Sequence, residues 1–140
     1  MAISIVLDTC VFISALRSSQ GASFKLLSAI DNEKFDLYLS VPLILEYEAV
    51  AKRESRAIGL THTDIEDIID YLCLMGKHRQ IHFLWRPNLK DPADDFVLEL
   101  AVESECNYIV THNVKDFKGA EKFQLDVLTP QKFLKLIGET

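Results

Sequence analysis

The chain has 140 residues, of which 49% are hydrophobic and 26% are charged, and its formal net charge is −6. This length fits one domain that buries a core without disulfides or a structural metal. An acidic chain is a poor general coat for nucleic acid, because such proteins bind by neutralising phosphates. The charge leaves room for an enzyme that reaches phosphates through metal ions.

The sequence contains no apolar run near the roughly 20 residues that cross a bilayer, and its start lacks the basic segment of a signal peptide. Its three cysteines, Cys10, Cys73 and Cys106, are widely spaced and form no CxxC motif. We interpret them as small core residues of a reduced protein. These features predict a cytoplasmic protein that does not contact membranes.

Short apolar stretches alternate with helical patterns along the chain. The predicted strands, rich in aliphatic and aromatic residues, are Ile3–Leu7, Leu37–Val41, Ile81–Trp85, Tyr108–Thr111 and Asp126–Leu128. The predicted helices are Val11–Leu16, Ala22–Ile30, Pro42–Arg53, Asp64–Lys77, Pro92–Glu105 and Pro130–Ile137. This alternation predicts a single doubly wound α/β domain over residues 1–140, with three layers (α/β/α) and a mostly parallel sheet of roughly five strands.

Several helix starts have local sequence signals. Thr63 and Glu66 have the spacing of a capping box. Pro42, Pro92 and Pro130 each stand where a first helical residue is expected, a position that favours proline.

Acidic residues follow the predicted strands, where open parallel sheets bind their ligands. The residues in question are Asp8 after the first strand, Glu46 in the helix after the second, Asp91, Asp94 and Asp95 at the start of the helix after the third, and Asn113 and Asp116 after the fourth. Because these strands end at one edge of the sheet, we expect the side chains to converge there. Oxygen ligands without a His or Cys partner suit Mg²⁺ or Mn²⁺.

Each of these residues also has a purely structural interpretation. Asp91 before Pro92 suits a helix N-cap, and acids in the next turn suit the helix dipole. Glu46 fits a solvated helix position and Asp116 fits a turn. Asp8 is the hardest to explain in this way, because it caps a helix only if that helix begins immediately after it.

The two adjacent aspartates of one helix are predicted to differ. Asp94 shares a helix face with Val97, Leu98 and Ala101, and that apolar face must pack toward the sheet. Asp95 lies on a mixed face with Glu99, nearer the flank of the helix. We therefore expect Asp94 to point toward the site.

The segments "IVLDTCVFISAL", "LSVPLILEYEAVAKR" and "DPADDFVLELAVESECNYIVTHNVKDF" resemble PIN-domain proteins of the kind found as VapC-type toxins of toxin–antitoxin pairs. The resemblance covers nearly the whole chain. It assigns the first family aspartate to Asp8, followed by Thr9, and the glutamate to Glu46. The third acidic position is Asp94 or Asp95, and the "T-x-D/N" element is Thr111 with Asn113.

This resemblance implies a metal-dependent ribonuclease that forms a homodimer and is held by a protein antitoxin. Asp8 and Asp94 would bind one Mg²⁺ or Mn²⁺ directly, while Glu46 and Asp116 (or Asn113) would bind through water or a second ion. The ion would activate water for hydrolysis of an RNA phosphodiester. Thr111 is expected to fix the local turn.

One departure from the family pattern leaves two alternatives open. Asn113 stands where many relatives have Asp, and Asp116 is the candidate replacement carboxylate. The alternative function is a catalytically inactive PIN-fold module that acts through protein or RNA contacts. Scattered cations, Lys115 and Lys118 among them, suit either RNA phosphates or an ordinary solvated surface.

Overall fold

The computed structural model describes residues 3–81 and 92–139. Five parallel strands form one sheet in the order β3-β2-β1-β4-β5. The strands are β1 (Ile3–Leu7), β2 (Phe35–Leu39), β3 (Lys77–His78), β4 (Tyr108–Val110) and β5 (Asp126–Leu128). The chain builds the sheet outward in one direction from β1 to β3 and in the other direction from β4 to β5. The switch point therefore lies between β1 and β4, and the predicted doubly wound fold is confirmed.

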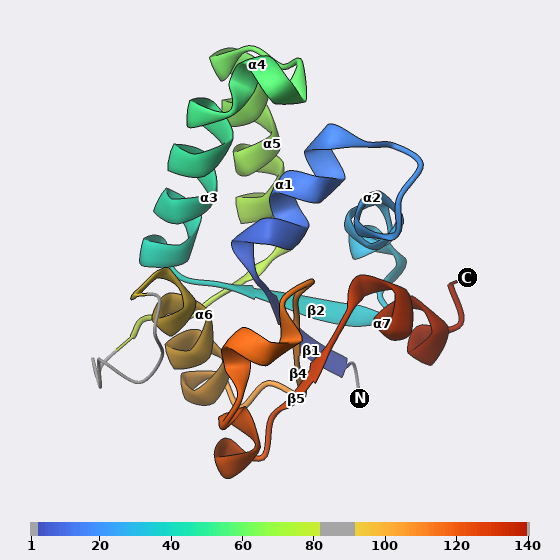
Figure 1. Ribbon diagram of the computed structural model, residues 1–140, viewed down its shortest axis with the longest axis vertical. Coiled ribbons are helices and arrows are strands. Elements are labelled where there is room, and N and C mark those ends of the chain that lie inside the picture. The colour runs from blue at the N-terminus through green and yellow to red at the C-terminus, as the bar shows by residue number, and fades with distance from the viewer. Residues whose placement is uncertain (1–2, 82–91, 140) are drawn as a thin grey trace.

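Helices cover both faces of the sheet. The described residues form α1 (Thr9–Arg17), α2 (Ala22–Ser28), α3 (Val41–Arg53), α4 (Ser55–Ile58), α5 (His62–Met75), α6 (Pro92–Glu103) and α7 (Pro130–Ile137), with 3₁₀ turns η1 (Ile30–Asn32), η2 (Val114–Phe117) and η3 (Ala120–Phe123). Helices α1, α3 and α5 lie on one side of the sheet and α6 lies on the other (Figure 1). Helix α7 packs against α2. Across the described ranges, no helix is long and apolar enough to span a membrane.

Core contacts hold the middle of α3 against the end of β1. Tyr47 of α3 is fully buried and stacks on Phe12 of α1, with 4.9 Å between the ring centroids. Its hydroxyl donates a hydrogen bond to the backbone carbonyl of Leu7. Burial, followed by the nearby charge of Asp8, raises the pKa of this phenol well above its ordinary value, so it remains a donor.

The second strand lies earlier in the chain than predicted. It ends at Leu39 rather than Val41, because Ser40 already caps α3: its Oγ accepts a hydrogen bond from the Leu43 amide at 3.3 Å. Helix α3 thus begins at Val41, one residue before the predicted start, and Pro42 is its second residue rather than its first. Pro92 and Pro130 do begin α6 and α7, as predicted.

The third strand differs from the prediction. The chain enters the sheet at Lys77, directly after α5, and β3 is only two residues long. Gly76 permits this entry, because a Cβ atom there would lie 2.5 Å from Cδ1 of Leu39. Ile81 is not in a strand, and residues 82–85 of the predicted strand lie outside the described residues.

The start of α5 also corrects a prediction. The capping box is formed by Thr61 and Asp64, with both reciprocal hydrogen bonds at 3.0 Å, and not by Thr63 and Glu66. Helix α4 was not predicted, and Gly59, in the left-handed conformation, follows its last residue. Helix α5 then begins at His62, two residues before the predicted start at Asp64. Glu66 instead pairs with Lys52 across α3 and α5 at 2.6 Å.

Candidate active site

Asp8 stands at the switch point of the sheet. Its backbone amide donates to the carbonyl of Val110 at the end of β4, at 2.9 Å. Helix α1 begins at Thr9, two residues before the predicted start, so Asp8 occupies the N-cap position. However, its side chain accepts no capping hydrogen bond, although it is only 6% exposed. Capping therefore does not explain this buried carboxylate.

The carboxylate of Asp8 points to side chains on either side of the switch point. Thr111 Oγ1 donates a hydrogen bond to Asp8 Oδ2 at 2.6 Å, and the Cys10 thiol donates to the same oxygen at 3.3 Å. Oδ1 accepts no hydrogen bond from the residues that the structure describes. Two donors thus fix the carboxylate through one oxygen and leave the other for a ligand.

Cys10 is a stable donor in this arrangement. Burial raises the pKa of its thiol to about 11, and the negative charge of Asp8 contributes in the same direction. The thiol therefore stays protonated at neutral pH. Because a protonated thiol is a poor nucleophile, we assign Cys10 a supporting role rather than covalent chemistry.

The loop after β4 is tied down at several points. The Thr111 amide donates to the Leu128 carbonyl at 2.9 Å, and Thr111 Oγ1 accepts from the Asn113 amide at 3.0 Å. His112 is held by Ser23 of α2, with 3.0 Å between Nε2 and Oγ. Thr111 fixes the local turn, as predicted, and it also orients Asp8.

Helix α6 buries more carboxylates than predicted. Asp94 is 8% exposed, Asp95 1% and Glu99 2%. Burial therefore does not separate Asp95 and Glu99, on their mixed helix face, from Asp94. The physical reason is that α6 contacts β1, β4, α3 and η2, so neighbours cover most of its circumference. Asp94 is buried, as its apolar helix face predicted.

The other candidate residues lie on elements that reach the same edge. Glu46 is half-buried on α3, one residue before Tyr47, and the starts of α3 and α6 lie close together (Figure 1). Asn113 and Asp116 are exposed, and the Asp116 amide donates to the Asn113 carbonyl at 2.9 Å. No hydrogen bond among the described residues joins Glu46, Asn113 or Asp116 to the Asp8 carboxylate. Asp91 lies outside the described residues.

The ligand chemistry at this edge suits a hard cation. Every buried charged side chain in the described parts of the chain is a carboxylate: Asp8, Asp94, Asp95 and Glu99. Carboxylate oxygens are the ligands that Mg²⁺ and Mn²⁺ prefer. Within residues 3–81 and 92–139, however, no three acidic, His or Cys side chains form a closed metal-binding group.

The comparison with known families assigns the chain to one of them. A family model described as PIN domain matches residues 4–115, which includes Asp8, Glu46, Asp94 and Asn113. The chain belongs to the PIN-domain family. PIN domains are generally nucleases, and these nucleases generally use divalent metal ions. A search of curated proteins found no match to this PIN domain.

Two residues of this PIN domain were not singled out from the sequence. Cys10 was interpreted as a core residue, although its place two positions after Asp8 put it within reach of the carboxylate. Glu99 lies four residues after Asp95, and such like-charged pairs destabilise a helix. The signal that could have predicted its burial is its position in the sequence, where Glu99 is flanked by the apolar residues Val97, Leu98, Leu100 and Ala101.

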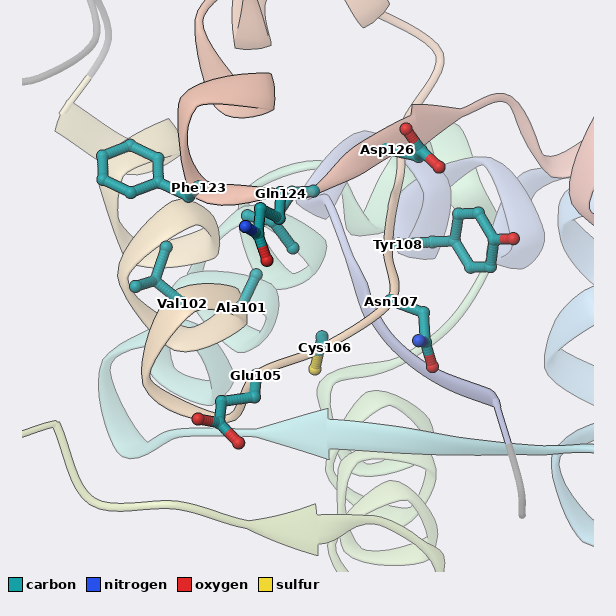
Figure 2. Close-up of a pocket in the computed structure, with 10 residues that line it drawn as sticks. Ala101, Val102, Glu105, Cys106, Asn107, Tyr108, Phe123, Gln124 and Asp126 are labelled. Carbon is teal, nitrogen blue, oxygen red and sulfur yellow. The ribbon is translucent and has the colours of Figure 1, made fainter.

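A separate pocket lies at the opposite, amino-terminal edge of the sheet (Figure 2). It has a volume of about 470 Å³ between the end of α6, β4, β5 and the residues after η3. Glu105, Asn107, Tyr108 and Asp126 contribute to its lining. Because β4 and β5 separate it from Asp8, this pocket is not part of the candidate active site.

Proposed function

We propose that this PIN domain is a metal-dependent endoribonuclease that hydrolyses RNA phosphodiester bonds. The observation that supports this most is the side chain of Asp8. It occupies a helix N-cap position, yet its carboxylate accepts hydrogen bonds from Thr111 and Cys10 at the switch point and makes no capping bond. A buried carboxylate is costly unless it is hydrogen-bonded, paired with a positive charge or bound to a metal ion.

In the proposed site, Asp8 and Asp94 hold a Mg²⁺ or Mn²⁺ ion directly. Glu46 and Asp116 (or Asn113) act through water or a second ion. A bound ion would lower the pKa of the water that it binds and would stabilise charge on the phosphate. Thr111 and Cys10 hold Asp8 Oδ2 so that Oδ1 faces the ligand, and the hydrogen bond from Tyr47 to Leu7 keeps α3, and with it Glu46, against the end of β1.

The test is incubation of the purified protein with defined RNAs in Mn²⁺, in Mg²⁺ and in excess EDTA, beside an Asp8→Asn control. We expect internal cleavage with either metal ion and none in EDTA or with the variant. Full activity in EDTA would exclude the metal mechanism. A folded protein that cleaves no RNA under any condition would favour the inactive binding module.

We also propose, from the resemblance to VapC-type toxins, that the chain is the toxin of a toxin–antitoxin pair and forms a homodimer. The surface of α3 and α5 supports self-association. Val41, Leu45 and Leu74 are 68%, 57% and 79% exposed, and α3 packs directly against α5. Val41 and Leu45 lie one helical turn apart on α3, and exposed apolar patches are typical of protein interfaces.

Light scattering at micromolar concentration tests the homodimer. We expect a dimeric mass for the wild-type chain and a monomeric mass for Leu74→Glu, which places a charge in the proposed contact. A wild-type chain that is strictly monomeric would refute this part of the proposal.

A further inference from the structure

A groove runs along the exposed edge of the sheet, beside β5. It has a volume of about 560 Å³, within the usual range for small-ligand sites. The buried ring of Phe117 contributes to its lining, together with the apolar side chains of Val114, Leu125 and Val127. Val114 is 40% exposed despite being apolar. Because Phe117 and Leu125 are almost fully buried, Val114 and Val127 carry the apolar surface that the groove exposes.

One end of the groove adjoins the candidate active site. Val114 follows Asn113 directly, and the hydrogen bond from the Thr111 amide to the Leu128 carbonyl ties the end of β4 to the end of β5. The same Thr111 side chain holds Asp8. The groove thus begins beside the loop that holds Asp8.

Two lysines line the groove near this end. Lys115 and Lys118 are exposed, and neither forms an ion pair with any residue that the structure describes. In contrast, Lys52 is paired with Glu48 at 3.1 Å and with Glu66 at 2.6 Å. Asp116 lies between the two lysines, so residues 114–118 carry two positive charges and one negative charge. The lysines are therefore available to a phosphate.

The other end of the groove is acidic. Glu121 and Asp126 line it there, and Glu121 Oε2 is fixed by the Gly119 amide at 3.0 Å. These carboxylates would repel a second phosphate. Because the charge of the lining changes from positive to negative along the groove, we expect it to accept only a short length of a nucleic-acid strand.

We propose that this groove holds one nucleotide of single-stranded RNA beside the cleaved phosphodiester. Its base lies on the apolar surface around Val114, and its phosphate contacts Lys115 and Lys118. Base contacts of this kind tolerate different sequences, because every base has an apolar face. The inference rests on the proposed ribonuclease function for the identity of the ligand.

The experiment measures binding without cleavage. A fluorescent single-stranded RNA oligomer is titrated with the Asp8→Asn protein in EDTA at several salt concentrations. Lys115→Gln/Lys118→Gln is compared, in this background, with Lys132→Gln/Lys135→Gln, which removes two exposed lysines from α7. A further variant, Val114→Glu, places a charge on the apolar surface. Melting temperatures confirm that each variant is folded.

We expect the groove pair to weaken binding and to lower the salt slope by about 0.7 for each lost phosphate contact. The α7 pair should leave both unchanged, and Val114→Glu should weaken binding at every salt concentration. Equal effects of the two lysine pairs, or no binding of the oligomer at low salt, would overturn the proposal. If only the Lys115→Gln/Lys118→Gln variant weakens binding but the wild-type protein cleaves no RNA, the groove is supported as an RNA-binding site and the nuclease function is refuted.

Discussion

The two edges of the sheet use polar residues for different purposes. At the carboxyl edge, Asp8 is buried and bonded to Thr111 across the switch point, and its side chain does not cap the helix that follows it. At the amino edge, Asn107 Oδ1 accepts from the Ser4 amide at 2.8 Å, and the Cys106 amide donates to the Ala101 carbonyl at 2.9 Å to close the end of α6. The polar groups at the amino edge hold the chain together.

In this comparison, a pocket in the surface is weaker evidence for a catalytic site than a buried carboxylate that does not cap its helix. The pocket in Figure 2 is well formed, yet its shape follows from two chain reversals at Glu105 and Gln124, with φ angles of 53° and 63°. At the carboxyl edge, Asp8 is buried after β1, and Asp94 and Asp95 are buried at the start of α6, which contacts β1. Burying these carboxylates costs free energy of folding.

The largest difference between the edges should appear when one aspartate is neutralised on each. We expect Asp8→Asn to lower the cleavage rate by about a hundredfold or more, because an amide is a poor ligand for a hard cation. Asp36→Asn, on β2 beside Ser4 at the amino edge, should leave the rate unchanged. Cleavage rates and circular dichroism of both variants check this. Similar activity losses would erase the distinction between the edges.

Within the carboxyl edge, Asp94→Asn should reduce activity far more than Asp95→Asn. Burial no longer separates the two residues, so the prediction rests on the helix phase that directs Asp94 toward the sheet. If both acids only complement the helix dipole, each change costs about 0.3–1 kcal/mol of stability and little activity. Rates and melting temperatures decide between these outcomes, and a larger loss for Asp95→Asn would reverse the assignment.

Thr111 provides a graded test of how Asp8 is held. Thr111→Val keeps the shape but removes the hydroxyl that bonds both Asp8 and the Asn113 amide. We expect a loss of about 10–100-fold in metal affinity or activity and of about 1–3 kcal/mol in stability. Thr111→Ser should recover most of both, as measured by metal titration and by denaturant unfolding. An active Thr111→Val protein would contradict the orienting role.

The smallest effect should come from the amino edge. Glu105 follows α6 in a left-handed conformation, which disfavours side chains with a Cβ atom. Glu105→Gly should therefore stabilise the protein by about 1 kcal/mol without changing cleavage. Denaturant unfolding measures the gain, and a destabilised or inactive variant would show that this edge does more than support the fold.

Sequence reasoning placed Asp8 at the carboxyl edge of the sheet because the topology made its position meaningful. Strand periodicity placed Asp8 directly after β1, and the βαβ alternation brought the ends of β1 and β4 to one edge. The hydrogen bond between Asp8 and Thr111 was not predictable, because it joins residues 103 positions apart through side-chain geometry.

Other failures have local physical causes. The second strand was placed too late because Val41 is apolar, although Ser40 and Pro42 already start a helix there. Asp95 and Glu99 were assigned to a flank because a mixed helix face usually meets solvent. Burial of α6 by neighbours on several sides depends on long-range packing, which periodicity does not record.

Thermal unfolding with and without Mn²⁺ tests the central claim most directly, because it requires no knowledge of the RNA target. An ion that binds only the folded state raises the melting temperature, and the rise continues with the logarithm of the ion concentration above the Kd. We predict a rise with increasing Mn²⁺ for the wild-type chain, an unchanged response for Asp36→Asn, and a lost response for Asp8→Asn. A wild-type chain that Mn²⁺ does not stabilise, or an Asp8→Asn protein that it stabilises equally, would contradict a metal site at the carboxyl edge.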